Sequence, residues 1–254
     1  MKLFVVSDIH SFYTPLKEAL DEKGFDPNDD NHWLIVCGDC FDRGDESAEL
    51  LHYLMNLERK VLVKGNHDTL LEECCLRGFP RSNDYPNGTF KTINDIGGAG
   101  EGKPFDECCN TTWNKLSRYR ELLVNYFETK NYIFVHSWIP CKLTARTHPA
   151  DKWITLVDRE YMEDWRNANG VEWEEAMWGN PFVLAEQDLN KTGKTIVFGH
   201  WHCSSGHKRL GNCEDEFKYA IWEPCYFKNT IGIDRCTAHT GKVNVLVLED
   251  ELLV

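Results

Sequence analysis

The chain has 254 residues, of which 42% are hydrophobic and 12% aromatic, and its formal net charge is −13 at pH 7. That length and apolar content are enough to bury a substantial core, and they exclude an intrinsically disordered protein. The acidic balance argues against a surface for long nucleic acids or anionic membranes, because such partners need clustered Lys and Arg. A small phosphate pocket lined by metal ions remains compatible with the charge.

The first residues, "MKLFVVSDIH", reach charged side chains after a short apolar run, so we expect no secretion signal. No run in the sequence approaches the length of a membrane span. Eleven cysteines are present, some as adjacent pairs such as Cys74 with Cys75, and adjacent cysteines rarely bridge each other. We therefore expect free thiols and a cytoplasmic protein.

Short runs rich in Val and Ile, each ending in polar or glycine-rich residues, predict buried strands. These runs are 3–7, 33–37, 60–63, 132–135, 195–198, 230–233 and 243–248. Helices are predicted between them at 15–23, 47–57, 69–76 and 113–127. The strand–helix alternation in the first third indicates βαβ units with a partly parallel sheet, and the later strands indicate a second sheet.

Two stretches have no clear periodicity. Residues 77–102 are rich in Gly, Pro and Asn and predict a loop or cap, whereas residues 140–190 carry Trp153, Trp165, Trp173 and Trp178, which favour core and cap packing. No repeat or linker divides the sequence. We expect one catalytic domain over residues 1–254, with cap-like insertions around 77–112 and 140–190.

Polar side chains follow five of the predicted strands at once. The segments are "SDIH" with Asp8 and His10, "GDCFDRG" with Asp39, Asp42 and Arg43, "GNHD" with Asn66 and His67, "VHS" with His136, and "FGHWH" with His200 and His202. Functional groups of α/β folds collect beyond the carboxyl ends of the strands, so these groups are expected to converge.

The combination of carboxylates and imidazoles suits divalent Mn, Fe or Zn. A pair of metals a few ångströms apart needs a bridging carboxylate, and such pairs activate water and hold phosphoryl oxygens. The predicted ligands are Asp8 and His10 for one metal, Asn66, His136 and His200 for the other, and Asp39 between the two. Taken singly, Asp8 could cap a helix and His136 could be a hydrogen-bonded core histidine. Five groups in this order at strand ends favour a common site.

The motif order D-x-H, G-D-x-x-D-R-G, G-N-H-[DE] and two later histidines resembles the calcineurin-like metallophosphoesterase superfamily. The D-R-G signature at 42–44 is specific to its phosphoprotein-phosphatase branch, which includes bacterial and phage serine/threonine protein phosphatases and symmetrical diadenosine tetraphosphatases. The segment 231–250 resembles the closing strand pair of the family. The resemblance implies an α/β fold with two mixed β-sheets packed as a sandwich flanked by helices, a four-layer arrangement.

The resemblance also implies roles. Asp8, His10 and Asp39 would bind one metal, and Asp39, Asn66, His136 and His200 the other; the metals would be Mn, with Fe or Zn as alternatives. Arg43 would grip the substrate phosphate, aided by Asn66, because a guanidinium fork suits phosphate oxygens. His67 would be the general acid, with Asp42 fixing its tautomer. The implied reaction is single-step attack by a metal-bridging hydroxide.

Four positions need separate treatment. Ser11 stands where relatives commonly have glycine, and Asn180 stands in "MWGNP" where many have a second phosphate-binding arginine. Asn180 is the predicted substrate-binding replacement, and Arg146 or Arg166 are alternative cations. We interpret His202 as a pocket-rim residue rather than a third ligand, and Cys40 as a small filler.

The first functional hypothesis is a serine/threonine protein phosphatase that acts on a phosphorylated protein or a small phosphoester. The alternative is a symmetrical dinucleoside polyphosphatase or another nucleotide phosphohydrolase, which would need a narrow pocket with an aromatic clamp. A non-catalytic binding protein on the same fold is the third hypothesis. The sequence leaves the oligomeric state open.

Overall fold

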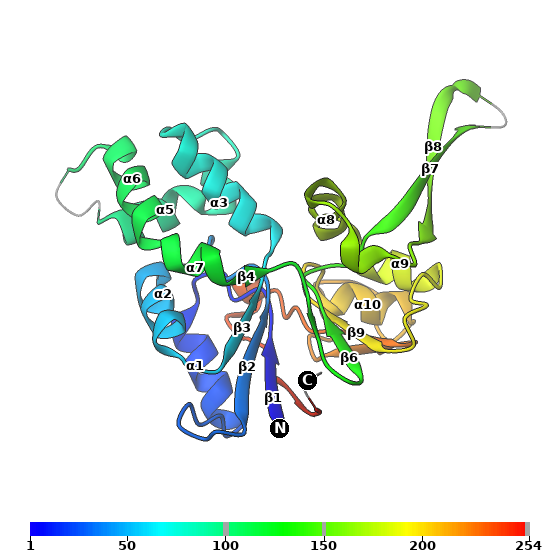
Figure 1. Ribbon diagram of the computed structural model, residues 1–254, viewed down its shortest axis with the longest axis horizontal. Helices are drawn as coiled ribbons and strands as arrows, with labels where there is room; N and C mark the ends of the chain where they lie inside the picture. Colours follow the sequence, from blue (N-terminus) through cyan, green and yellow to red (C-terminus); the bar gives the residue numbers. More distant parts are fainter. Residues whose placement is uncertain (99–101, 149–150, 252–254) are drawn as a thin grey trace.

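The computed structural model describes residues 1–98, 102–148 and 151–251. Two five-stranded mixed β-sheets form the centre of the molecule, with helices on their outer sides (Figure 1). This arrangement confirms the predicted α/β class and the second sheet. That the whole chain is one domain stays a prediction.

The first sheet has the strand order β12-β1-β2-β3-β4. Its strands are β1 (Lys2–Val6), β2 (His32–Cys37), β3 (Lys60–Val63), β4 (Leu123–Val124) and β12 (Leu246–Glu249). The strands β1 to β4 are parallel, and β12 is antiparallel to β1. The helices α1 (Tyr13–Glu22), α2 (Ser47–Asn56) and α3 (Asn66–Arg77) follow β1, β2 and β3, as predicted for βαβ units.

The second sheet has the order β10-β11-β9-β6-β5. Its strands are β5 (Phe127–Glu128), β6 (Tyr132–Phe134), β9 (Thr195–Phe198), β10 (Cys225–Phe227) and β11 (Thr230–Gly232). The predicted closing strand pair is wrong, because β11 lies in this sheet and β12 in the other. The connection between them carries the short helix α11 (Thr237–Thr240) and crosses from one sheet to the other.

The two sheets pack face to face through a fully apolar layer. Its buried members are Leu3, Val5, Ile35, Cys37, Phe134, Val197, Ile231, Ile233 and Leu246. The alternate residues of β1 and β2, such as Phe4 and Val36, face the helices instead. Because both faces of these strands are buried, their sequences are continuous apolar runs rather than alternating ones.

The described residues of the predicted loop or cap at 77–102 include two helices, which corrects the prediction of a loop. These are α4 (Asp84–Asn87) and α5 (Thr89–Gly97), followed by α6 (Phe105–Lys115). The glycines that suggested a loop end helices: Gly78, Gly88 and Gly98 all have left-handed φ near +80°. Glycine is favoured at that position because it lacks the Cβ penalty. The helix predicted at 113–127 is also wrong in extent, since α7 (Ser117–Leu122) ends it before β4.

Residues 140–190 contain an antiparallel hairpin of β7 (Cys141–His148) and β8 (Asp151–Tyr161), which projects away from the sheets (Figure 1). The short helix η1 (Trp165–Asn167), α8 (Gly170–Met177) and α9 (Pro181–Glu186) follow it. Trp165 and Trp173 are buried, as predicted, but Trp178 is 49% exposed. The side chain of Trp153 lies outside the described residues.

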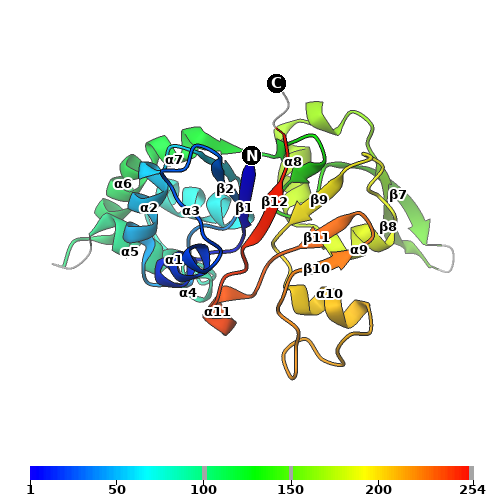
Figure 2. The same cartoon turned by 90° about the horizontal axis from the view of Figure 1, so that it is seen from below.

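The helix α10 (Cys203–Arg209) lies beside β10 on the outer side of the second sheet (Figure 2). Taken together, the helices in the described ranges include none that is long and apolar enough to cross a lipid bilayer.

Candidate metal and phosphate site

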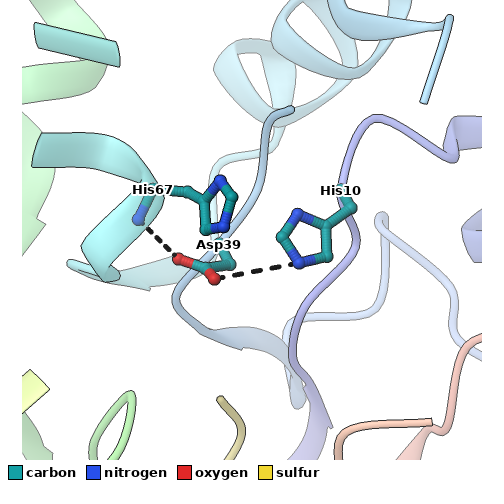
Figure 3. Close-up of side chains that lie close together, drawn as sticks. All are labelled: His10, Asp39 and His67. Carbon is teal, nitrogen blue, oxygen red and sulfur yellow. Dashed lines mark hydrogen bonds and ion pairs between the residues drawn. The ribbon is translucent and has the colours of Figure 1, made fainter. Parts of the chain in front are cut away.

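The parallel strands of both sheets end at one edge, and the predicted site residues meet there. The loops after β1, β2, β3, β6 and β9 supply them. Within the described ranges, two groups of three side chains could each hold one metal ion, namely His10, Asp39 and His67, and Asp39, His136 and His200. Figure 3 shows the first group, with Asp39 between the two imidazoles. Asp39 belongs to both groups, as expected of a bridging residue.

His10 presents one ring nitrogen to two carboxylates. Its Nδ1 donates to the carbonyl of Phe41 at 2.9 Å, which leaves the lone pair on Nε2. That Nε2 lies 3.9 Å from Asp8 Oδ1 and 3.8 Å from Asp39 Oδ2. A second partner that fixes the tautomer is usual for metal-binding histidines.

His136 is held in the same way. Its Nδ1 donates to the carbonyl of Cys37 at 2.9 Å, so Nε2 carries the lone pair. Around Nε2 lie Asn66 Oδ1 at 2.8 Å, His200 Nδ1 at 3.1 Å and Asp39 Oδ1 at 3.5 Å. Several buried acceptor atoms therefore face one another at short distance, an arrangement that a cation would stabilise. The donor set fits two divalent metals.

Burial and neighbouring charges shift the pKa values of the carboxylates and imidazoles in the cluster. Burial raises the pKa of Asp8 to about 7, with a further contribution from the neighbouring Asp39 charge. Burial alone would also raise the pKa of Asp39, but the surrounding imidazoles, His136 first, hold it below its usual range. Burial lowers the pKa of His10 and lowers that of His200 to about 3. Neutral imidazoles are the form that binds metal.

His67, Asp42 and Arg43 form a second unit beside the metal cluster. His67 Nδ1 donates to Asp42 Oδ2 at 2.8 Å, and Arg43 Nη2 lies 3.3 Å from His67 Nε2. Burial would lower the pKa of His67, but the Asp39 and Asp42 carboxylates raise it. An imidazole that holds its proton, with a carboxylate behind it, is suited to general acid catalysis.

The helix α5 of the 77–112 insertion supports this unit directly. Thr89 Oγ1 donates to Asp42 Oδ2 at 2.7 Å, and the amide of Asp42 donates to Thr92 Oγ1 at 3.0 Å. Lys91 Nζ donates to the carbonyl of Arg43 at 3.1 Å. The insertion that the sequence suggested as a cap therefore also holds the segment with Asp42 and the phosphate-binding candidate Arg43 in position.

The backbone of the site adopts an unusual conformation. Left-handed φ values are found at the non-glycine residues Asp8, His10, Ser11, Asp39, Asp42, Arg43 and His200. Such conformations cost about 1–3 kcal/mol each and persist only where the surroundings impose them. Ser11 has φ of 61°, and its Oγ lies 2.8 Å from Ser47 Oγ, so a hydroxyl contact supports a backbone state that relatives commonly give to glycine.

Glycines allow the loops to approach one another. A Cβ at Gly65 would lie 2.2 Å from Asp39 Oδ1 and 2.4 Å from the Asp39 backbone nitrogen, and one at Gly199 would lie 2.1 Å from Asp8 Oδ2. The glycines before Asn66 and His200 therefore let the backbone approach the site closely.

We expect Gly65→Ala to lower the free energy of unfolding by about 3 kcal/mol, because backbone atoms of Asp39 cannot move aside cheaply. Urea unfolding of the metal-free protein measures this loss. The matched control is Gly170→Ala at the start of α8, where nothing lies within 4 Å of the new Cβ. The control should change stability by less than about 1 kcal/mol, and equal effects in both variants would contradict the steric argument.

The remaining predicted positions lie elsewhere. Asn180 caps α9, since its Oδ1 accepts from the amides of Phe182 and Val183, and its substrate-binding role stays a prediction. Arg166 pairs with Glu128 at 2.7 Å, away from the cluster, and the side chain of Arg146 lies outside the described residues. Cys40 is buried, and burial raises the pKa of its thiol, as expected of a filler.

Sequence reasoning missed two supporting residues, Asp234 and Thr89, and named a third, Asp68, only as part of "GNHD". Asp234 is a buried carboxylate whose charge interacts with Asp8, and its Oδ1 accepts from the amide of Cys236 at 2.6 Å. Thr89 holds Asp42, as described above. Asp68 accepts from the amide of Gly65 and from Tyr119 Oη, at 2.8 and 2.7 Å. Only Asp68 had a readable signal, because an acidic residue at the third helical position is a common N-terminal cap.

Two mixed sheets with a buried carboxylate–imidazole cluster at their common strand ends define the class of metallophosphoesterase folds. The chain belongs to the calcineurin-like phosphoesterase family, whose sequence model matches residues 1–204. The match covers every residue of the cluster and ends just after His202.

Curated relatives point to one group within the family. A symmetrical bis(5'-nucleosyl)-tetraphosphatase of Pseudomonas fluorescens is 45% identical over 202 residues, covering 79% of this chain and 64% of the relative. One of Thioalkalivibrio sulfidiphilus is 41% identical over 69 residues, 27% of this chain and 25% of the relative. The chain therefore aligns with less than two thirds of the length of either relative.

Solved structures share the fold. A cold-active protein-tyrosine phosphatase of a psychrophilic Shewanella species superposes with a TM-score of 0.55 at 14% identity, covering 98% of this chain and 75% of that one. A structure titled a putative diadenosine tetraphosphatase gives 0.50 at 16% identity, covering 97% and 89%. At these identities the likeness extends to the fold alone.

Proposed function

We propose that the protein is a metal-dependent phosphoester hydrolase that cleaves symmetrical dinucleoside tetraphosphates. The carrying observation is the convergence of Asp8, His10, Asp39, Asn66, His136 and His200 beside the Arg43–His67 pair. The relatives named as tetraphosphatases favour this alternative over a serine/threonine protein phosphatase, the first hypothesis from sequence.

Exposed aromatic rings beside the cluster support a nucleotide substrate. Trp178 is 49% exposed and meets the His200 ring edge-on with centroids 6.3 Å apart, and Trp201 is 37% exposed. A large ring left partly exposed next to a phosphate site can stack on a nucleobase. Both rings lie beside His200, one of the proposed metal ligands.

Each part of the site then has its own role in the proposed hydrolysis. Two divalent cations, for which we propose Mn, would polarise the phosphoryl oxygens and lower the pKa of water. The Arg43 guanidinium binds phosphoryl oxygens in a fork. His67 gives a proton to the leaving nucleoside diphosphate oxygen, while Asp42 holds the ring. Water adds to one inner phosphorus, the central P–O bridge breaks, and two nucleoside diphosphates result.

A cytoplasmic location belongs to the same proposal. All eleven cysteines are free, including neighbours such as Cys108 and Cys109. Buried thiols without bridges are usual for proteins of a reducing compartment.

With Mn present, we expect kcat/KM for a dinucleoside tetraphosphate to exceed that for a phosphoserine peptide by about 100-fold, or ~2.7 kcal/mol. The measurement is chromatography of the products, which should be nucleoside diphosphates only. Chelator-treated protein is the control and should be inactive. A preference for the phosphopeptide would contradict the substrate assignment, and failure on these and on an aryl phosphate with metal bound would contradict the enzyme assignment.

A further inference from the structure

A cluster of four rings is formed by the residue before α10, the loop that follows α10, and α11. We call it the aromatic box, and it consists of His202, Phe217, Trp222 and His239. The His202 centroid lies 5.8 Å from Phe217 and 6.2 Å from Trp222, and the His239 centroid lies 5.5 Å from both of those rings. Three segments of the chain thus bring these rings together, namely the start of α10, the loop after α10 and α11.

The box is open rather than buried. Phe217 is 53% exposed, His239 is exposed, and His202 and Trp222 are half-buried. The rings meet at angles between 46° and 81°, so no pair in the box is stacked face to face. Because the rings do not stack in parallel on one another, their faces remain available for contact with a planar ligand.

Polar contacts hold the backbone beside the open rings in place. The carbonyl of Trp222 accepts from Asn244 Nδ2 at 2.7 Å, and Asn244 is itself buried. The amides of Phe217 and Lys218 both donate to Asp215 Oδ1 at 2.8 Å, which fixes a turn. An exposed phenylalanine on a loop that is tied down at both sides suits a binding surface better than a packing surface.

The box borders the phosphate chemistry. His202 follows the metal-ligand candidate His200 by two residues, and the amide of Cys203 donates to the carbonyl of Asp234 at 2.8 Å. Asp234 is buried and stands between β11 and α11 in the chain, so this backbone bond joins the start of α10 to the segment that leads into α11. In Figure 2 the loop after α10 descends beside α11, which carries His239.

We propose that the aromatic box is a nucleobase subsite that receives one base of the substrate while the phosphates lie at the metal cluster. The proposal rests on the proposed function for the identity of that substrate. Phe217, Trp222 and His239 lie beyond residues 1–204, which the family model matches. Stacking on such rings contributes about 1–3 kcal/mol per base.

The test compares two ligands that differ in the base. Calorimetric titration of the Mn-loaded protein with ADP and with ribose 5-diphosphate gives two dissociation constants, and wild type should bind ADP more tightly. Phe217→Leu should reduce the ratio of the two affinities about tenfold, which corresponds to ~1.4 kcal/mol. Trp222→Leu should do the same, provided that the melting temperature shows an intact fold.

The matched control is Tyr226→Leu, an aromatic residue of β10 that is 61% exposed and outside the box. It should leave the ratio unchanged. If Phe217→Leu lowers the affinity for both ligands equally, or for neither, the subsite is overturned. If ADP binds through the box but no dinucleoside tetraphosphate is cleaved, the subsite stands and the proposed function fails.

Discussion

Asp39→Asn is expected to reduce hydrolysis of an aryl phosphate by about 10³-fold, or ~4 kcal/mol of transition-state stabilisation. The reason is that Asp39 serves both halves of the cluster: one oxygen faces His10 and the other faces His136 and the amide of His67. An amide removes the negative charge shared by the two metals. Steady-state kinetics in Mn, together with metal content by atomic spectroscopy, measures the effect.

The matched control for that change is Asp45→Asn in the same loop. The Asp45 carboxylate is 80% exposed and pairs with Lys91 at the surface, so activity should change by less than about twofold. Loss of metal together with activity in Asp39→Asn supports the bridging role. Full activity with a full metal complement would show that another carboxylate joins the two ions.

Strands were the most predictable part of this fold. Each continuous apolar run was found as a strand, because the central strands are buried on both faces and their sequences show it directly. The hairpin of β7 and β8 was missed for the opposite reason. Among its described residues, Leu143 and Val157 are 44% and 51% exposed, so apolar residues do not alternate cleanly with polar ones there.

The helices of the 77–112 insertion show a different difficulty. Gly78, Gly88 and Gly98 read as loop residues, yet each lies at a helix end. A glycine indicates left-handed backbone but does not say whether a helix precedes it. Tertiary contact decides the matter here, since α5 is held by its packing on α6 and by its bonds to Asp42.

The candidate site was largely readable because its residues follow strands at once. The sequence could not show which residues far along the chain support the site. Thr89, which donates to Asp42, is 47 positions away from it, and Asp234 is far from Asp8 in sequence. The left-handed backbone at Asp39 and Arg43 could not be predicted either, since neither residue type requires that conformation. Strain of this kind is imposed by the surrounding loops and glycines.

For a phosphoester with a basic leaving group, such as phenyl phosphate, His67→Asn is expected to lower kcat by about 10²–10⁴-fold while the metal content stays that of the wild type. His67 donates to Asp42 through Nδ1 and lies beside the Arg43 guanidinium through Nε2. A nitrogen next to a guanidinium is poorly placed to bind a second cation, so we assign it to proton transfer. The loss should grow as the leaving group becomes more basic, and a series of aryl phosphates measures that slope.

The competing assignment is that His67 is a ligand, since one ligand atom each of His10, Asp39 and His67 lie within 4.8 Å of one another (Figure 3). Metal content separates the two: a ligand variant loses an ion, whereas an acid variant keeps it. Leaving-group dependence separates them again, because removal of an acid hardly affects a leaving group that needs no proton, such as nitrophenolate. Asp42→Asn should reproduce the same slope in weaker form, since it acts on His67 only through the Nδ1 bond.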